Sequence, residues 1–233
     1  MMVKPGNNQT QTKTVGNEMK IGILGSGMVG QQLGLGLSGS GHLVKIGTRN
    51  PDKLRDWQKQ TGEKVTIGSP AEAAAFGEIV IIATKWADEA TLKAIDSADR
   101  YNFKGKIVID VTNPLVSDGP GKPPIPGVGY PDSAGAIIQK RLPESRVVKA
   151  FNIIGAHYMT NPKLEEGAAT MFICGDDKAS NDFVAKLAAD WGWDVVDIGG
   201  IRESYLLEAL AMLWIRYGFL NNHWKHAFKL LRK

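Results

Sequence analysis

Short apolar runs recur along residues 19–200 of this chain, and helix-like segments follow several of them. The runs typical of buried strands lie at residues 20–24, 43–47, 64–67, 78–83, 106–110, 146–151, 170–175 and 193–198. The helix-like segments lie at residues 31–37, 51–61, 69–76 and 176–191. Strands that alternate with helices form βαβ units and a parallel sheet. We therefore predict an α/β fold with a doubly wound parallel sheet, in which the very apolar run 78–83 is central.

A different pattern follows at residues 201–233, which we assign to a C-terminal helical segment. Apolar residues recur there at alternating steps of four and three: Leu206, Leu210, Leu213, Tyr217, Leu220, Trp224, Ala227 and Leu231. This spacing predicts one apolar stripe along a helix of up to about seven turns, with a kink or break favoured at Gly218 or Asn221–Asn222. Because a small domain cannot cover so long a stripe, we expect a homodimer through this helix, and we expect residues 201–233 to contribute to the acceptor site as well.

Two stretches lack strand or helix patterns. Residues 1–18 are rich in Asn, Gln, Thr and Gly without an apolar core, which predicts a disordered tail and not a signal peptide. Residues 116–131 are rich in proline and glycine. A loop of this length beside a binding crevice is usually functional, often as a lid, and disorder is the alternative.

The most informative motif is a glycine-rich turn between the strand 20–24 and the helix 31–37. It reads Gly25, Ser26, Gly27, Met28, Val29 and Gly30. In a dinucleotide-binding turn the first glycine permits the bend, the second lets the backbone approach a pyrophosphate, and the third lets the helix pack on the strand. The alternative, a glycine-rich turn without a ligand, has less support because the strand and helix stand in the expected order. The motif predicts a Rossmann-type sheet.

The end of the next strand distinguishes between the two nicotinamide cofactors. A site for NAD places Asp or Glu here to bind the ribose hydroxyls, whereas this chain has Thr48 and Arg49, with Lys53 four residues further on. Arg49 can bind a 2′-phosphate with charge-assisted hydrogen bonds, which an acidic side chain would repel. Ordinary solvated cations are the alternative. We predict NADP as the cofactor.

Composition narrows the remaining classes of function. The 233 residues suffice for one large α/β domain with a small addition. No apolar run approaches the roughly 18 residues of a membrane span. The single cysteine, Cys174, permits neither an internal disulfide nor a thiolate metal cluster, and we predict a buried, inert thiol and a cytoplasmic location. The net charge of +4 does not indicate a nucleic-acid partner.

The sequence contains no clear candidate for a catalytic or metal-binding group. His223 and His226 are three residues apart but lack a third ligand nearby, so we predict no metal site. His157 is expected at the rim of the crevice. A carbonyl reductase usually needs a proton donor beside the carbonyl, and none stands out. Hydride transfer to a flavin-like ring asks mainly for alignment. Trp86 follows the strand 78–83 and either covers the core or forms a wall of the nicotinamide pocket.

Several motifs together resemble a known family. They are the glycine turn, Thr48–Arg49, Asn113–Leu115, Val147–Asn152, Cys174–Asp177 and Leu206–Leu210. Over about residues 20–217 they are similar to the NADP-dependent deazaflavin (coenzyme F-four-twenty) reductases. They also resemble the cytosolic NADPH-binding domain of the six-transmembrane metalloreductases, to which Asn152–Gly155 is closer.

This resemblance implies a Rossmann domain that works as a dimer and passes hydride between NADP(H) and a deazaflavin or flavin ring. By motif, Ser26, Gly27, Met28 and Val29 would hold the pyrophosphate. Thr48, Arg49 and Lys53 would hold the 2′-phosphate. The nicotinamide would be framed by Ala83, Thr84, Asn113, Pro114 and Ala150.

Two other functions remain open at this point. Pyrroline carboxylate reductases, which reduce small imines, open with a similar glycine turn but carry a longer helical dimerisation domain. A non-catalytic NADP-binding sensor, or a partner subunit of a separate membrane reductase, is the third hypothesis. Oxidation of NADPH by a panel of acceptors would separate the two enzymes from the third.

Overall fold

An eight-stranded sheet forms the centre of the described chain. The computed structural model describes residues 18–165 and 167–233, so the predicted tail at 1–18 lies almost wholly outside the described residues. The strand order is β10-β9-β8-β5-β4-β1-β2-β3. The strands span β1 Lys20–Leu24, β2 Leu43–Gly47, β3 Val65–Gly68, β4 Ile79–Ile82, β5 Ile107–Asp110, β8 Arg146–Lys149, β9 Thr170–Gly175 and β10 Asp194–Asp197.

The sheet is mostly parallel, with one reversal. The strands from β3 to β8 in the sheet order run parallel, and β9 pairs antiparallel with β8 through Val148–Gly175 and Lys149–Cys174. β10 is parallel to β9. The prediction of a Rossmann-type, doubly wound sheet is confirmed. Strands β9 and β10 run opposite to the others, because the connection from β8 to β9 returns the chain without a crossover α-helix.

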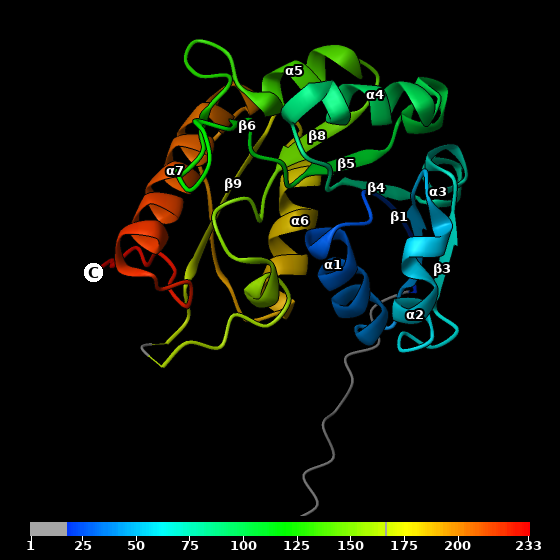
Figure 1. Cartoon of the computed structure of the whole chain (residues 1–233), viewed down its shortest axis with the longest axis horizontal. Coiled ribbons are helices and arrows are strands. Elements are labelled where there is room, and N and C mark those ends of the chain that lie inside the picture. The colour runs from blue at the N-terminus through cyan, green and yellow to red at the C-terminus, as the bar shows by residue number, and fades with distance from the viewer. Residues whose placement is uncertain (1–17, 166) are drawn as a thin grey trace, which may run out of the picture.

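Helices cover both faces of this sheet (Figure 1). They are α1 Met28–Gly39, α2 Arg55–Gln58, α3 Pro70–Phe76, α4 Ala90–Ser97, α5 Ala134–Arg141, α6 Lys178–Asp190 and α7 Ser204–Asn221. Alternate residues of the strands enter two separate apolar clusters. Ile79 and Ile81 of β4 pack with residues of α1, α6 and α7, whereas Val80 and Ile82 pack with α3, α4 and α5. A strand buried on both faces reads as a continuous apolar run, which is the pattern at 78–83.

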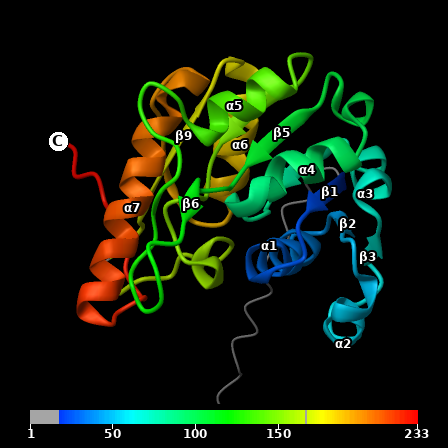
Figure 2. The same ribbon diagram turned by 45° about the horizontal axis from the view of Figure 1, so that its top comes forward.

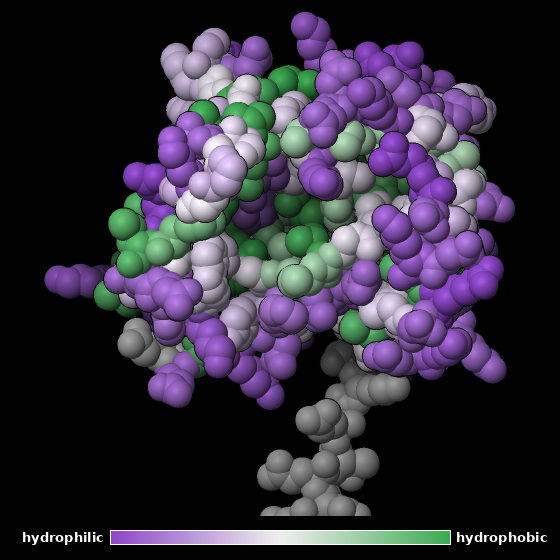
Figure 3. Space-filling view, viewed as in Figure 1, coloured by the Kyte–Doolittle hydropathy of each residue, from purple (hydrophilic) through white to green (hydrophobic). Residues whose placement is uncertain are grey.

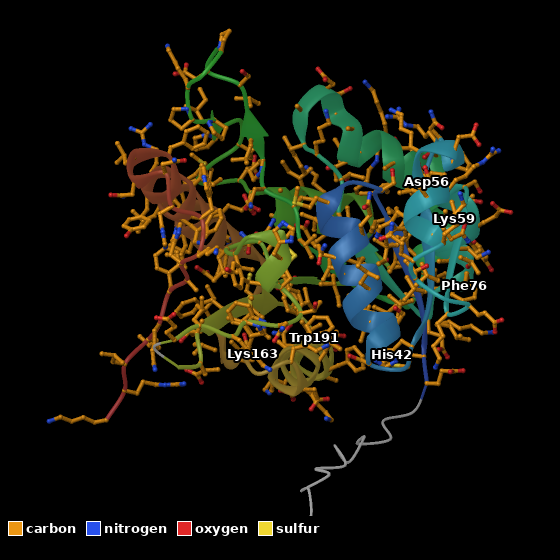
Figure 4. All side chains as sticks on the ribbon, turned by 60° about the horizontal axis from the view of Figure 1, so that its bottom comes forward. His42, Asp56, Lys59, Phe76, Lys163 and Trp191 are labelled. Atoms are coloured by element: carbon orange, nitrogen blue, oxygen red, sulfur yellow. The ribbon has the colours of Figure 1, made fainter. Side chains whose placement is uncertain are left out.

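Local chemistry explains where several helices begin. The Ser69 hydroxyl accepts from the Glu72 backbone N–H, and the Glu72 carboxylate accepts from the Ser69 N–H, which forms a capping box at α3. The Asp177 carboxylate caps α6 in the same way by accepting from the Ser180 N–H. At the far end of α6, the Trp191 indole donates to the Ser40 hydroxyl just after α1. Trp191 is labelled at this end of α6 in Figure 4.

Residues 51–61 differ from the prediction, and the predicted loop at residues 116–131 contains a short hairpin. The first segment forms a 3₁₀ turn, Pro51–Leu54, followed by the four-residue α2, and not one continuous helix. The second is ordered and holds a hairpin of β6 Leu115–Val116 and β7 Ile125–Pro126. The loop that carries this hairpin runs beside α7 in both ribbon views (Figures 1 and 2), where the Tyr130 and Tyr205 rings meet edge to face at 5.2 Å.

Helix α7 is shorter than the predicted stripe. It ends at Asn221, and Asn222 adopts a left-handed conformation (φ 45°), so the chain leaves the helix as the Asn221–Asn222 signal allows. The following residues return along β9: the Thr170 N–H donates to the Phe228 carbonyl at 2.8 Å. The prediction that Trp224, Ala227 and Leu231 continue the helical stripe is therefore wrong.

Leu210 of the predicted stripe packs against the core, but most of the stripe within α7 lies on a different face of the helix. Ser204, Leu207, Glu208, Ala211, Trp214 and Gly218 form the buried face. Leu206, Leu213, Tyr217 and Leu220 are exposed, Leu213 by 58% and Leu220 by 80%. The helix thus has apolar residues on two sides. Because the buried side also carries Ser204, Glu208 and Gly218, the spacing of apolar residues in the sequence does not identify it as the buried side.

Candidate functional site

Two cavities adjoin at the carboxyl ends of the central strands. One, of about 510 Å³, extends from the glycine turn to the end of β2. The other, of about 430 Å³, lies between the start of α1, the ends of β4 and β5, and the β6–β7 hairpin. Both are lined by Ala83, Thr84 and Lys85. We call them the phosphate cavity and the ring cavity. Figure 3 shows a hollow with a hydrophobic floor at the centre of this face.

The glycine turn has the geometry that a bound pyrophosphate needs. Gly25 has φ 122°, and a Cβ there would lie 2.3 Å from the Ala83 carbonyl oxygen. A Cβ on Gly30 would lie 2.0 Å from the Gly25 oxygen, whereas one on Gly27 would meet nothing within 4 Å. Gly25 and Gly30 are therefore constrained by the protein, and Gly27 faces open space. The N-terminus of α1 has no side-chain cap, which leaves its N–H groups for an anion.

The phosphate cavity is positively charged. Among its described lining residues are the cations Arg49, Lys53, Lys85 and Lys93, and no Asp or Glu. Hydrogen bonds fix Thr48 beside them: its hydroxyl lies 3.0 Å from that of Ser26 and accepts from the Asn50 N–H at 3.1 Å. This joins the end of β2 to the glycine turn. Four cations without a carboxylate fit a ligand with several phosphate groups, so the residues present fit NADP.

The wall of the ring cavity beyond β5 is held by paired amides. Asn113 donates to the Asn152 carbonyl at 2.8 Å, and Asn152 donates to the Asn113 side-chain oxygen at 2.9 Å. Asn152 also donates to the Leu207 carbonyl of α7 at 3.0 Å. The Thr84 hydroxyl donates to that of Thr91 at 2.9 Å. These bonds leave little freedom for the two polar groups that face the cavity.

Buried charge supports this wall from behind. The Lys149 ammonium lies 2.8 Å from an Asp110 oxygen and 2.8 Å from a Glu208 oxygen, and it donates to the Thr112 carbonyl at 2.6 Å. Burial opposes the positive charge, but Asp110 and Glu208 outweigh it and raise the pKa of Lys149. The ammonium is therefore charged at neutral pH and holds the chain just before Asn113.

Most of the predicted cofactor-binding residues meet at these two cavities. Those that line one or both are Gly25, Ser26, Gly27, Val29, Thr48, Arg49, Lys53, Ala83, Thr84 and Asn113. Four do not: Met28 is exposed, Gly30 packs beneath the turn, Ala150 is fully buried, and Pro114 precedes the hairpin. Trp86 lines the ring cavity and also packs against the core, so the two alternatives for it do not exclude each other.

The structure adds residues that the sequence pattern does not single out. Lys85 and Lys122 line the ring cavity. Lys93 of α4 joins the phosphate cavity. Isolated lysines carry no motif, so only the fold brings them together. His157 is exposed. Cys174 is buried, and burial raises the pKa of its thiol to about 12, which confirms an inert thiol.

Comparison with known proteins agrees with this site. A family model described as NADP oxidoreductase, coenzyme F420-dependent, matches residues 20–114. The F420-dependent NADP reductase of Methanocaldococcus jannaschii is 30% identical over 211 residues, which cover 84% of this chain and 91% of that protein. A crystal structure of a provisionally assigned F420-dependent NADP reductase from Arthrobacter sp. FB24 superposes with a TM-score of 0.86 at 34% identity, covering 92% of this chain and all of that one.

Two more distant relatives support less, because one is matched over part of its length and the other shares only the fold. The metalloreductase STEAP3 of Rattus norvegicus is 28% identical over 194 residues, which cover 83% of this chain but 36% of the relative. The chain thus spans about a third of the length of that protein. An imine reductase from Aspergillus terreus, solved in a nicotinamide complex, has a TM-score of 0.62 at 16% identity, covering 89% of this chain and 64% of that one, and shares the fold alone. Among the described residues no helix is long and apolar enough to cross a membrane.

Fold, glycine turn and cationic cavity define an NADP-dependent oxidoreductase. Within that class, the identity and coverage of the methanogen enzyme place the chain more narrowly: it belongs to the family of F420-dependent NADP oxidoreductases.

The first test of the site concerns the choice of cofactor. Loss of a charge-assisted contact to a phosphate costs on the order of 1.5–3 kcal/mol. Arg49→Ala should therefore weaken NADPH binding about tenfold or more and leave NADH binding nearly unchanged, as measured by titration calorimetry. Arg55→Ala is the matched control, because Arg55 is exposed, pairs with Asp52 and lines neither cavity. Equal losses for both cofactors would refute the assignment of Arg49.

The second test concerns the space above the glycine turn. Gly27 has φ −77°, which alanine adopts freely, and its Cβ would meet no protein atom. Gly27→Ala should keep the melting temperature within about 2 °C, corresponding to about 0.5 kcal/mol or less, yet weaken NADPH binding at least tenfold. Gly39→Ala, at another open position, should change neither quantity. Unchanged NADPH affinity in Gly27→Ala would show that no ligand approaches this backbone.

Proposed function

We propose that this protein transfers hydride between NADP(H) and a deazaflavin or flavin ring. The observation that carries the proposal is the continuity of the two cavities at Ala83–Lys85. A nicotinamide whose phosphates occupy the charged cavity would reach the ring cavity, which is lined largely by apolar groups. A flat ring stacked on the nicotinamide suits such a surface.

Residues of the chain would contribute binding, orientation and exclusion of water. Ser26, Gly27 and the start of α1 would hold the pyrophosphate, and Arg49 with Lys53 the 2′-phosphate. Asn113, fixed by Asn152, would orient the nicotinamide. NADPH supplies the hydride itself, so the protein's task is alignment. The β6–β7 hairpin covers one side of the ring cavity and would limit entry of water.

The alternatives make different demands on the ring cavity. An imine reductase needs a proton source beside its substrate, and the described cavity offers only lysines for this role. A non-catalytic NADP-binding subunit needs no acceptor cavity at all. The family relationship supports an enzyme, and the printed activity of the methanogen relative supports a deazaflavin as its acceptor.

Isotope transfer tests the reaction. Deuterium on C4 of NADPH should appear on the ring carbon of the reduced deazaflavin, because direct transfer allows no exchange with solvent. The same reaction with unlabelled NADPH in heavy water should leave that carbon unlabelled. Mass spectrometry of the product reads both. Release of the label into solvent contradicts direct transfer. Oxidation of NADPH by a small imine or carbonyl compound, but by neither deazaflavin nor flavin, favours the alternative enzyme.

The exposed apolar face of α7 supports a homodimer as part of this proposal. Leu206, Leu213 and Leu220 are exposed at seven-residue spacing along one side of α7. Such a stripe is typical of an interface. Neither cavity is lined by α7 or the residues after it in the same chain. The proposed role of residues 201–233 at the acceptor site would therefore require that this segment reach the ring cavity of the partner.

Sedimentation tests the dimer. Leu213→Asp places a charge in the middle of the stripe and should convert a dimer at micromolar concentration into a monomer, with circular dichroism to confirm folding. Gln60→Asp makes the same charge change at an exposed position outside α7 and should leave the dimer intact. A wild-type chain that sediments as a monomer refutes the proposal.

A further inference from the structure

The β6–β7 hairpin is fixed to the wall of the ring cavity at its base. The Leu115 N–H donates to the Asn113 carbonyl at 2.8 Å, and the Gly127 N–H donates to the Pro114 carbonyl at 2.6 Å. A Cβ on Gly127 would lie 2.6 Å from Val116 Cγ1, so the two strands are tightly apposed. The hairpin therefore keeps a defined position relative to Asn113.

The connection between the two strands turns back over the cavity. Gly119 and Gly121 have φ of 116° and 71°, which favour glycine. The Gly119 N–H donates to the Ser117 hydroxyl at 3.2 Å, and the Lys122 N–H donates to the Gly119 carbonyl at 3.3 Å. As a result Ser117 and Lys122 both line the ring cavity.

Lys122 is a cation of the ring cavity alone. The described lining of this cavity holds Lys85 and Lys122 and no carboxylate, and Lys85 also lines the phosphate cavity. The ammonium of Lys122 lies 3.5 Å from Asp118, with side-chain exposures of 63% and 46%. Such an exposed pair contributes roughly 0–1 kcal/mol, so Lys122 can exchange Asp118 for a better-placed anion at little cost.

We propose that Lys122 determines acceptor specificity by donating a charge-assisted hydrogen bond to an oxygen of the hydride acceptor. This inference rests on the proposed flavin or deazaflavin acceptor. Two parts of such an acceptor offer the same chemistry: the phosphate of its side chain, and the electron-rich carbonyl edge of its ring. Because Lys122 lines the ring cavity and not the phosphate cavity, its contribution concerns the acceptor and not NADPH.

Binding of FMN and of riboflavin to the NADP⁺-loaded protein tests this directly, with quenching of flavin fluorescence as the readout. Lys122→Met should weaken FMN binding about tenfold, the loss expected for a charge-assisted contact, and leave the Kd of NADPH unchanged. Lys122→Arg should restore most of the affinity. Lys186→Met is the matched control, because Lys186 forms a similar exposed pair with Asp190 on α6, away from both cavities.

The two flavins distinguish which oxygen of the acceptor Lys122 binds. Weakened binding of FMN but not riboflavin assigns the contact to the phosphate, and equal weakening of both assigns it to the ring edge. Unchanged binding of both flavins by Lys122→Met, in a protein that still reduces them, overturns the inference while leaving the proposed function intact. A wild-type protein that binds NADPH but neither binds nor reduces flavin or deazaflavin refutes the proposed function, and this inference with it.

Discussion

The buried ammonium of Lys149 is the constraint on which the arrangement of the site depends. A cation without solvent contact is stable only where its charge and its donors are satisfied. Here Asp110 of β5, Glu208 of α7 and the Thr112 carbonyl surround it. Removing one partner of such a group typically costs about 3–5 kcal/mol. Glu208 in turn accepts from the Ala134 and Gly135 N–H groups at the start of α5. The charge of Lys149 thus links strands β5 and β8 to helices α5 and α7 through hydrogen bonds and ion pairs.

This charge lies directly behind the ring cavity. Asp110 accepts from the Thr112 N–H at 2.8 Å while Lys149 binds the Thr112 carbonyl, so both ends of that residue are fixed. Asn113 follows at once and is locked to Asn152, which also binds α7. The position of α7 and the position of the proposed nicotinamide-binding amide are therefore coupled through a few short hydrogen bonds. A dimer formed through the outer face of α7 would rest on the same framework.

The part of the fold that follows from local chemistry could be predicted from the sequence. The glycine turn, the Ser69–Glu72 cap and the continuous apolar run of β4 each determine their own conformation. The antiparallel β9, the packing face of α7 and the role of Lys149 could not, because each depends on residues distant in sequence. The face of α7 that packs on the core carries Ser204, Glu208 and Gly218. These residues are there because Ser204 bonds Ser133 at the start of α5, Glu208 pairs with Lys149, and Gly218 leaves room for Trp224. Helical periodicity of apolar residues does not reveal such contacts.

The same distinction separates the two halves of the site. The glycine turn, Thr48, Arg49 and Lys53 of the phosphate cavity follow directly after β1 and β2, where the sequence motif lies, whereas Lys85 and Lys93 come from the end of β4 and from α4. The ring cavity combines the ends of β4 and β5 with a hairpin that the motif does not include. The preference for NADP can therefore be predicted from Thr48, Arg49 and Lys53, which are close in sequence. The proposed acceptor preference depends instead on the position of Lys122, which the hairpin fixes relative to Asn113.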